Sequence, residues 1–248
     1  MLKIGIVGLP NVGKSTLFNA LTKACVPAEN YPFCTIDPSV GVVGVPDERL
    51  GALTTFSKSE KTIPAAIEFV DIAGLVKGAA TGEGLGNQFL ANIRETDAIL
   101  ELVRFFDDPN VLHVEQSIEP YKDIEIINLE LVLSDAEQVK KRRDKISGDI
   151  KAGRKEFIAE DATLVKLEQG FSMGKFALHS ELTDDEKKLV AHLNLLTMTP
   201  VLYALNKKSG GKNLDEINDG RAERAYELIK SLGGKYIFLD ANTERELN

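Results

Sequence analysis

The pattern that decides the fold is GLPNVGKS at residues 8–15, which matches G-x-x-x-x-G-K-[ST] in full. Residues 3–7, KIGIV, precede it and are typical of a buried strand, and residues 16–21, TLFNAL, follow it with a helical pattern. A glycine-rich turn at this place lets backbone N–H groups surround a phosphate in front of the helix N-terminus. We favour this interpretation over a glycine turn that serves only packing, because a strand and a helix flank the motif.

Five positions, two of them inside this motif, fit the chemistry of a bound phosphate and its magnesium ion. Lys14 is expected to reach the β and γ phosphates, and the Ser15 hydroxyl to bind Mg²⁺. A second strand pattern ends in Asp71, which is placed to hold the Mg²⁺ shell, and Gly74 lets a backbone N–H approach the γ phosphate. Thr35 is either a second hydroxyl ligand of the metal, ordered by the γ phosphate, or only a turn residue in a proline-bounded loop.

Composition bounds the class of protein. The 248 residues are 43% hydrophobic and 27% charged, so the chain can bury a core and is not globally disordered. The net charge of -8 argues against a surface that coats a polyanion non-specifically, although a local basic stripe is compatible with it. Two cysteines, Cys25 and Cys34, are too few for a zinc site or a disulfide framework. The first residues lack the length of a signal peptide or a membrane span, so we expect a cytoplasmic protein without membrane contact.

Four segments together resemble the YchF / Obg-like ATPase family of P-loop NTPases: residues 8–16, 31–36 (YPFCTI), 71–79 (DIAGLVKGA) and 82–90 (GEGLGNQFL). The resemblance implies an α/β Ras-like G domain with a mainly parallel sheet flanked by helices, interrupted by an antiparallel helical coiled-coil arm. We expect the nucleotide-binding domain at residues 1–127 and 200–248, and the arm at 128–199. Family members continue into a small β-rich TGS domain, and we expect the chain to lack this C-terminal module.

The resemblance also suggests how water is positioned for hydrolysis. Many switch GTPases place a glutamine directly after D-x-x-G, but here that residue is Leu75, which cannot hydrogen-bond. The family assigns the task to a loop histidine, and His113 stands at the matching position; the alternative is an ordinary loop histidine. Asn11 resembles the residue that holds a monovalent cation, K⁺, in potassium-stimulated relatives, and tying the loop is an equally good interpretation.

A heptad stripe predicts the arm. Between Leu129 and Phe157, positions alternately three and four apart are mostly apolar, which predicts one helix of roughly thirty residues. A partner strip can return antiparallel through Leu164, Leu167 and Phe171, followed by Leu189, Leu193 and Leu196. The arm is locally basic at residues 140–145 and at Lys151, Arg154 and Lys155. This run is either a solvated helix face or, as the resemblance implies, a contact for the ribosome or ribosomal RNA.

Base recognition departs from both known patterns. A buried strand ends in Asn206, where guanine-specific relatives have N-K-x-D, but here Lys207, Lys208 and Ser209 follow. A carboxylate accepts two hydrogen bonds from guanine, which Ser209 cannot do, whereas Asn206 can bond either purine. Obg-like ATPases typically have N-x-x-E. Residues 238–242, FLDAN, occupy the place of the S-A-K loop and depart from it too.

These patterns predict slow, Mg²⁺-dependent hydrolysis of ATP, with a GTPase or a dual-specificity enzyme as the alternative. A second alternative is a nucleotide-gated binding platform in which hydrolysis is only a timer. His113 and Lys14 are the expected catalytic residues, and Ser15, Thr35 and Asp71 the expected metal ligands. The residues expected to contact the nucleotide are Asn11, Val12, Gly13, Lys14, Ser15, Thr16, Gly74, Asn206, Lys207 and Ser209.

Overall fold

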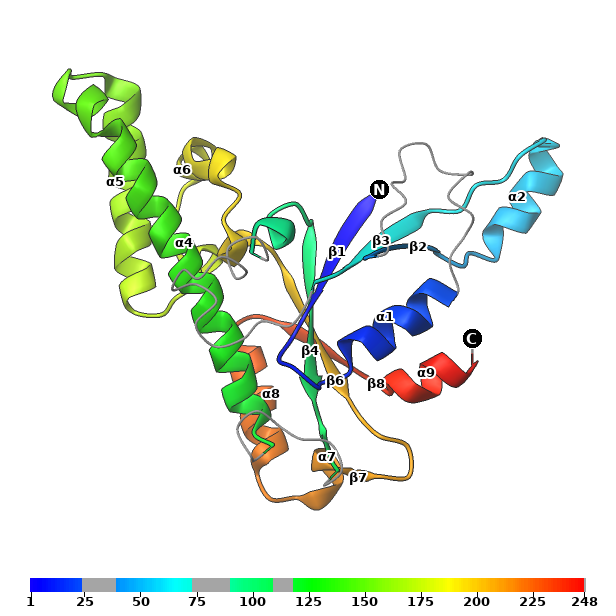
Figure 1. Ribbon diagram of the computed structural model, residues 1–248. Helices are drawn as coiled ribbons and strands as arrows, with labels where there is room; N and C mark the ends of the chain where they lie inside the picture. Colours follow the sequence, from blue (N-terminus) through cyan, green and yellow to red (C-terminus); the bar gives the residue numbers. More distant parts are fainter. Residues whose placement is uncertain (24–38, 73–89, 109–117, 248) are drawn as a thin grey trace. The chain divides into compact units, whose positions relative to one another are not determined.

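The structure is a computed structural model that describes residues 1–23, 39–72, 90–108 and 118–247 (Figure 1). It divides into two compact units. The sheet unit contains the described parts of Met1–Gly74, Thr96–Pro120 and Val201–Asn248, and the helical unit those of Leu75–Glu95 and Tyr121–Pro200. The division at residues 127 and 200 expected from the sequence stays a prediction.

A six-stranded sheet forms the centre of the sheet unit, in the order β2-β3-β1-β4-β6-β8. Only β2 runs antiparallel to its neighbour; all other neighbours are parallel. The central strands are almost continuously apolar because a parallel sheet is covered on both faces. This confirms the predicted fold class. The strands are β1 (Leu2–Val7), β2 (Val40–Gly44), β3 (Ala66–Asp71), β4 (Ala98–Arg104), β6 (Val201–Asn206) and β8 (Lys235–Leu239).

Helices cover the sheet. In Figure 1, α1 and α9 lie together on one side of the sheet, where they contact each other, and α8 lies on the other side against β8. A short ribbon of β5 and β7 joins the loops beyond β4 and β6. Including α2 and α7, the elements of the sheet unit outside the six-stranded sheet are α1 (Lys14–Lys23), α2 (Arg49–Ser57), β5 (Phe106–Asp107), β7 (Lys212–Asn213), α7 (Leu214–Ile217), α8 (Arg221–Ser231) and α9 (Ala241–Leu247).

The helical unit is built on the long helix α4 (Pro120–Lys151) and its antiparallel partner α5 (Lys155–Ser172), which lie side by side in Figure 1. Arg142 binds both carboxylate oxygens of Glu160 at 2.7 and 2.8 Å, and Arg143 pairs with Asp161 and Glu168. The remaining elements are α6 (Asp184–Val190) and the short 3-10 helices η3 (Ala177–His179), η4 (Ala191–Leu193) and η5 (Leu196–Met198).

The expected single helix over residues 129–157 was wrong at both ends. The helix already begins at Pro120 and ends at Lys151, where Gly153 adopts a left-handed φ of 75° and reverses the chain. Phe157 therefore lies on α5, and Leu129, counted in the stripe, is 53% exposed. The inner part of the stripe is confirmed, because Val132, Val139 and Ile146 are buried one heptad apart. Leu164, Leu167 and Phe171 on α5, spaced three and four apart, are buried as well.

A buried carboxylate, Asp135 on α4, organises the rest of the helical unit. It pairs with Arg94 at 2.8 Å and accepts hydrogen bonds from the backbone N–H of Leu196, the backbone N–H of Thr197 and the Thr197 hydroxyl. Because these four donors satisfy the charge, the segment before β6 is held on α4; breaking such a buried pair typically costs about 3–5 kcal/mol. Within the described ranges, no helix is both long and apolar enough to span a membrane.

Candidate nucleotide site

The loop between β1 and α1 has a backbone that only glycine allows at two positions. Gly8 has a φ of 152°, and a Cβ there would lie 2.5 Å from the carbonyl oxygen of Leu102. Gly13 has a φ of 103°, and its Cβ would lie 2.6 Å from Nδ2 of Asn206. Asn11 is exposed with a left-handed φ of 63°, which asparagine tolerates better than most residues. The first helical hydrogen bond runs from the N–H of Leu17 to the Gly13 carbonyl at 2.9 Å, so the loop leads directly into α1.

Lys14 and Asp71 meet beside this loop. The Lys14 side chain is buried and donates to the Leu9 carbonyl at 2.8 Å, inside the loop. Burial lowers the pKa of Lys14, and the charge of Asp71 partly opposes this. Asp71 is brought next to β1 by the pairing of Ile6 with Asp71, and burial raises its pKa against the opposing charge of Lys14. The two groups therefore interact electrostatically at the carboxyl ends of adjacent parallel strands.

The donor set fits a magnesium ion. Oδ1 of Asp71 is buried and has no hydrogen-bond partner among the described residues, and Ser15 is exposed at the start of α1. Mg²⁺ prefers oxygen ligands and usually takes only one or two from the protein, with waters and substrate phosphates completing the shell. In the described part of the chain, no group of three or more His, Cys, Asp or Glu side chains is gathered to hold a metal. Thr35, Gly74 and His113 lie outside the described residues, so their roles stay predictions.

Asn206, at the end of β6, connects the loop to α9. Its Nδ2 donates to the Val12 carbonyl at 2.8 Å, and its Oδ1 accepts from the Ala241 N–H at 3.1 Å. The residue is only 4% exposed, and Val12 is 1% exposed. Thr16, on the first turn of α1, is partly exposed. The structure therefore gives Asn206 a positioning contact between two segments, in addition to the base contact expected from the sequence, which stays a prediction.

An open pocket of about 500 Å³ lies beyond Asn206, within the usual range for small-molecule sites. Lys207 lies on one wall with its Nζ 5.4 Å from the centre of the Phe238 ring. It pairs with Asp215 at 2.8 Å and Glu216 at 3.2 Å, and these carboxylates raise its pKa, with Asp215 the larger cause. The residues lining the pocket are Lys207, Lys208, Ser209, Gly210, Gly211, Asn213, Glu216, Phe238, Leu239, Asp240 and Thr243.

Sequence reasoning missed the part that Asp240 takes in this pocket. The backbone N–H of Ser209 donates to Oδ2 of Asp240 at 2.7 Å, so the residue that replaces the expected acid is bound to an acid on another strand end. An aspartate directly before residues 241–244, ANTE, is typical of a helix N-cap, and this signal could have pointed to Asp240 as a cap of α9. The contact with Ser209, however, joins residues 31 positions apart.

Residues 3–141 match the family model described as 50S ribosome-binding GTPase. The chain is 50% identical over 235 residues to the ribosome-binding ATPase YchF of Bacillus subtilis, and 49% identical over 231 residues to that of Escherichia coli O157:H7. Each alignment covers 92% of this chain and 64% of the relative, so the chain spans less than two thirds of their length. A solved structure, the YchF GTPase of Schizosaccharomyces pombe, superimposes with a TM-score of 0.79 at 36% identity, covering 99% of this chain and 67% of that one.

The chain belongs to the YchF family. The resemblance drawn from the four sequence segments is thereby confirmed. The YchF relatives carry both ATPase and GTPase in their names, so the names do not decide which purine this chain takes.

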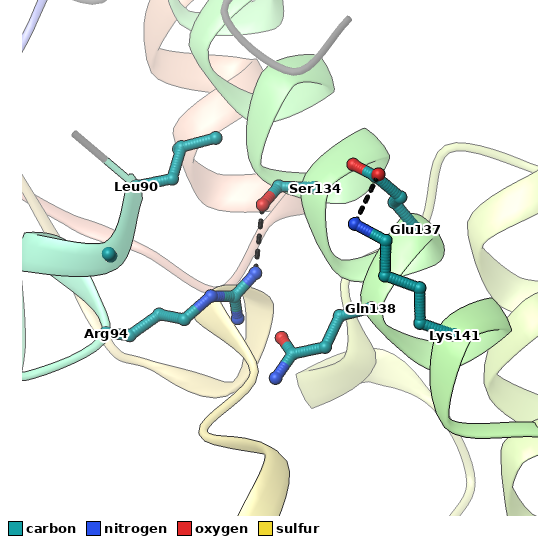
Figure 2. A pocket seen from close by; sticks show the side chains of 7 residues that line it. Leu90, Arg94, Ser134, Glu137, Gln138 and Lys141 are labelled. Carbon is teal, nitrogen blue, oxygen red and sulfur yellow. Dashed lines mark hydrogen bonds and ion pairs between the residues drawn. The ribbon is translucent and has the colours of Figure 1, made fainter. Parts of the chain in front are cut away.

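The helical unit of this YchF-family chain carries a second, smaller pocket of about 180 Å³, shown in Figure 2. Arg94 enters it from one side and donates to the Ser134 hydroxyl at 2.9 Å, while Lys141 on α4 pairs with Glu137 at 2.6 Å. Both cations that line it are thus already paired within the described residues. The pocket offers no unsatisfied positive charge for a ligand.

The basic run on the arm divides into two groups. Lys141, Arg142, Arg143 and Arg154 pair with acids of α4 or α5. The other four basic side chains are exposed and form no ion pair within the described residues: Lys140, Lys145, Lys151 and Lys155. The charge available to a polyanion is therefore about half of what the sequence displays.

Proposed function

We propose that this chain binds ATP with Mg²⁺ and hydrolyses it slowly, and that the nucleotide state switches its affinity for a partner. The observation that carries the proposal is the loop of residues 8–15, in which left-handed glycines flank the segment that binds the buried Lys14, near Asp71, whose Oδ1 has no hydrogen-bond partner among the described residues. Backbone N–H groups, one lysine and one carboxylate at the N-terminus of a helix are the components with which P-loop proteins bind a triphosphate.

Each residue has a role in this proposal. Lys14 leaves the Leu9 carbonyl and stabilises charge on the β and γ phosphates, while Ser15, Asp71 and Thr35 hold Mg²⁺, and Gly74 donates a backbone N–H to the γ phosphate. When bound, Mg²⁺ neutralises charge that develops on the phosphate oxygens. His113 positions the attacking water in place of a glutamine, because Leu75 has no hydrogen-bonding group. Asn11 holds K⁺ or ties the loop.

The base pocket supports ATP over GTP. Ser209 has no carboxylate for the guanine N1–H and N2 amino group, and the Asp240 carboxylate is already bound to backbone and hydroxyl donors. Asn206 keeps one N–H and one lone pair beyond its two contacts, which suffice for the edge of either purine. GTP or dual specificity is the second candidate, since the S. pombe relative is called a GTPase.

The ribosome is the partner we propose, together with a cytoplasmic location, because the bacterial YchF relatives are named ribosome-binding ATPases. Four exposed lysines of the arm, residues 128–199, form no ion pair with any residue that the structure describes, and they supply positive charge for ribosomal RNA. If nucleotide-dependent ribosome association persists in a variant that cannot hydrolyse ATP, the chain acts as a gated platform with hydrolysis as its timer.

The test is Mg²⁺-dependent turnover of ATP and GTP by the wild-type protein and by Lys14→Ala. We expect ATP to be preferred, and Lys14→Ala to lower kcat/KM by about 100-fold or more, because it removes a charge aimed at the transition state. Lys58→Ala, at an exposed position after α2, is the matched control and should not change turnover. A clear preference for GTP, or full activity in Lys14→Ala, would overturn the proposal.

A further inference from the structure

Two positions that depart from the base-recognition patterns implied by the resemblance are in contact. Ser209 follows β6 at the place of the acid in N-x-x-E or N-K-x-D, and Asp240 follows β8 in the segment at the place of the S-A-K loop. Their contact is the hydrogen bond from the Ser209 N–H to Oδ2 of Asp240 at 2.7 Å. The acid that is missing from one strand end is therefore present at the next, in the same pocket.

The Asp240 carboxylate is fully used by the protein. Oδ1 accepts from the N–H groups of Asn242 at 3.0 Å and Thr243 at 3.2 Å. Oδ2 accepts from Ser209 and from the Thr243 hydroxyl at 2.8 Å. A carboxylate has about four acceptor positions, and all four are taken. Burial by itself raises the pKa of Asp240, but these hydrogen bonds outweigh it and place the pKa below its ordinary value.

Three hydrogen bonds join the two strand ends around the pocket. Oδ1 of Asn206 accepts from the backbone N–H of Ala241 at 3.1 Å, and the backbone N–H of Lys207 donates to the Leu239 carbonyl at 2.7 Å, both at the base of the loop. The bond from Ser209 to Asp240 lies farther out, where Gly210 has a left-handed φ of 66° and nothing lies within 4 Å of its Cβ position. Asn213 also binds the loop, through the backbone N–H and carbonyl of Lys208, and Asp240 is the residue that ties Ser209 to the end of β8.

We propose that Asp240 is a positioning residue of the base pocket: it holds loop 207–211 against the start of α9, so that the pocket wall is set before the nucleotide binds, and it does not itself contact the base. The inference rests on the proposed function. Pre-ordering a loop raises affinity because the entropy of ordering is not lost on binding. The effect is confined to the base end, since the phosphate loop is held by its own backbone and by Asn206.

The test is Asp240→Asn, measured by equilibrium binding of a non-hydrolysable ATP analogue, of the matching GTP analogue and of inorganic tripolyphosphate. Asparagine caps helices as well as aspartate, so α9 stays capped, but its amide cannot accept from both Ser209 and the α9 N–H groups. We expect Kd for the ATP analogue to rise about tenfold, the usual effect of losing a hydrogen bond to a charged group, and Kd for tripolyphosphate to stay unchanged.

Two further variants complete the experiment. Asp219→Asn is the matched control, because Asp219 accepts from the N–H and Nε of Arg221 before α8 and does not line the pocket. It should bind all three probes like the wild type. Thr243→Val removes one donor to Asp240 but leaves the Ser209 bond, and it should raise Kd for the ATP analogue two- to threefold at most.

Three outcomes would overturn the positioning role. If Asp240→Asn binds the ATP analogue with unchanged affinity, Asp240 does not position the pocket. If it binds the ATP analogue and tripolyphosphate equally more weakly, the role of Asp240 is generally structural. If only the GTP analogue binds more weakly, Asp240 contacts guanine directly. A wild-type protein that binds neither nucleotide analogue defeats the proposed function and this inference with it. Wild-type binding of the ATP analogue that Asp240→Asn leaves intact defeats only the inference.

Discussion

The phosphate end and the base end of the candidate site are built in different ways. At the phosphate end, eight consecutive residues carry the geometry in their own backbone, through the left-handed φ of Gly8, Asn11 and Gly13. At the base end, the ends of two parallel strands are joined by side chains, through Asn206 and Asp240. Phosphate has the same shape in every nucleotide, so one contiguous motif suffices. A base needs contacts from several directions, and these come from residues far apart in the sequence.

The difference teaches where each end is vulnerable. A backbone-built loop fails when a Cβ is added, because no side-chain rotation relieves a wrong φ. A side-chain-built pocket fails by degrees, as single hydrogen bonds are lost. Asn206 belongs to both, since it donates to Val12 in the phosphate loop and accepts from Ala241 at the base end.

Gly13→Ala should have the largest effect. A methyl group would lie 2.6 Å from Nδ2 of Asn206, whose position is held by two hydrogen bonds, and the φ of 103° is strained for alanine. We expect a loss of about 2–3 kcal/mol in unfolding free energy and at least about 100-fold weaker ATP binding. Chemical denaturation and ATP titration measure the two.

The control for this variant is Gly51→Ala. Gly51 lies in α2 with nothing within 4 Å of its Cβ position and an ordinary helical backbone. It should leave ATP binding unchanged and raise the unfolding free energy by about 0.5–1 kcal/mol. If Gly13→Ala behaves like Gly51→Ala, the phosphate end does not depend on backbone conformation and the comparison breaks down.

Asn206→Ala should have an intermediate effect at both ends. It leaves the Val12 carbonyl and the Ala241 N–H without their partner, which costs about 1–3 kcal/mol in stability. Affinity for both ATP and tripolyphosphate should fall, which distinguishes it from Asp240→Asn. The exposed neighbour Asn242→Ala serves as the control and should be near neutral. An Asn206→Ala protein that loses ATP but keeps tripolyphosphate would show that Asn206 serves the base end alone.

The smallest expected effect concerns base selectivity. The double change Ser209→Asp with Asp240→Ser returns the acid to the loop after β6 and a hydroxyl to the end of β8. We expect the ratio of GTP to ATP affinity to rise by about tenfold, since a carboxylate can pair with guanine. Ser209→Asp alone is the control, because it places two like charges together and should not gain GTP affinity. Competition titrations of GTP against ATP measure this ratio of affinities. An unchanged ratio in the double variant would contradict the explanation of base selectivity.

The sequence predicted the mainly parallel sheet correctly, but it placed both ends of the long helix wrongly. Apolar strands such as β1 and β6 and the glycine-lysine loop are local signals, and the structure forms a strand at each of the two predicted places. The predicted helix extended past Gly153 because seven-residue spacing of apolar residues does not reveal where a chain reverses. Leu129 was counted as buried on spacing alone, whereas its exposure depends on what packs against α4.

By itself, the sequence determined the fold class, the strand, loop and helix at residues 3–21 and the family. These depend on short-range sterics and on apolar periodicity, which neighbouring residues carry. Only the tertiary structure decided that Arg142 and Arg143 form ion pairs with acids of α5. It also decided that Asn206 bridges the phosphate loop and α9, and that the Asp240 carboxylate binds the Ser209 N–H. Each of these is a directional contact within about 3 Å between residues distant in the chain, and such contacts exist only once the sheet and the helices have brought the residues together.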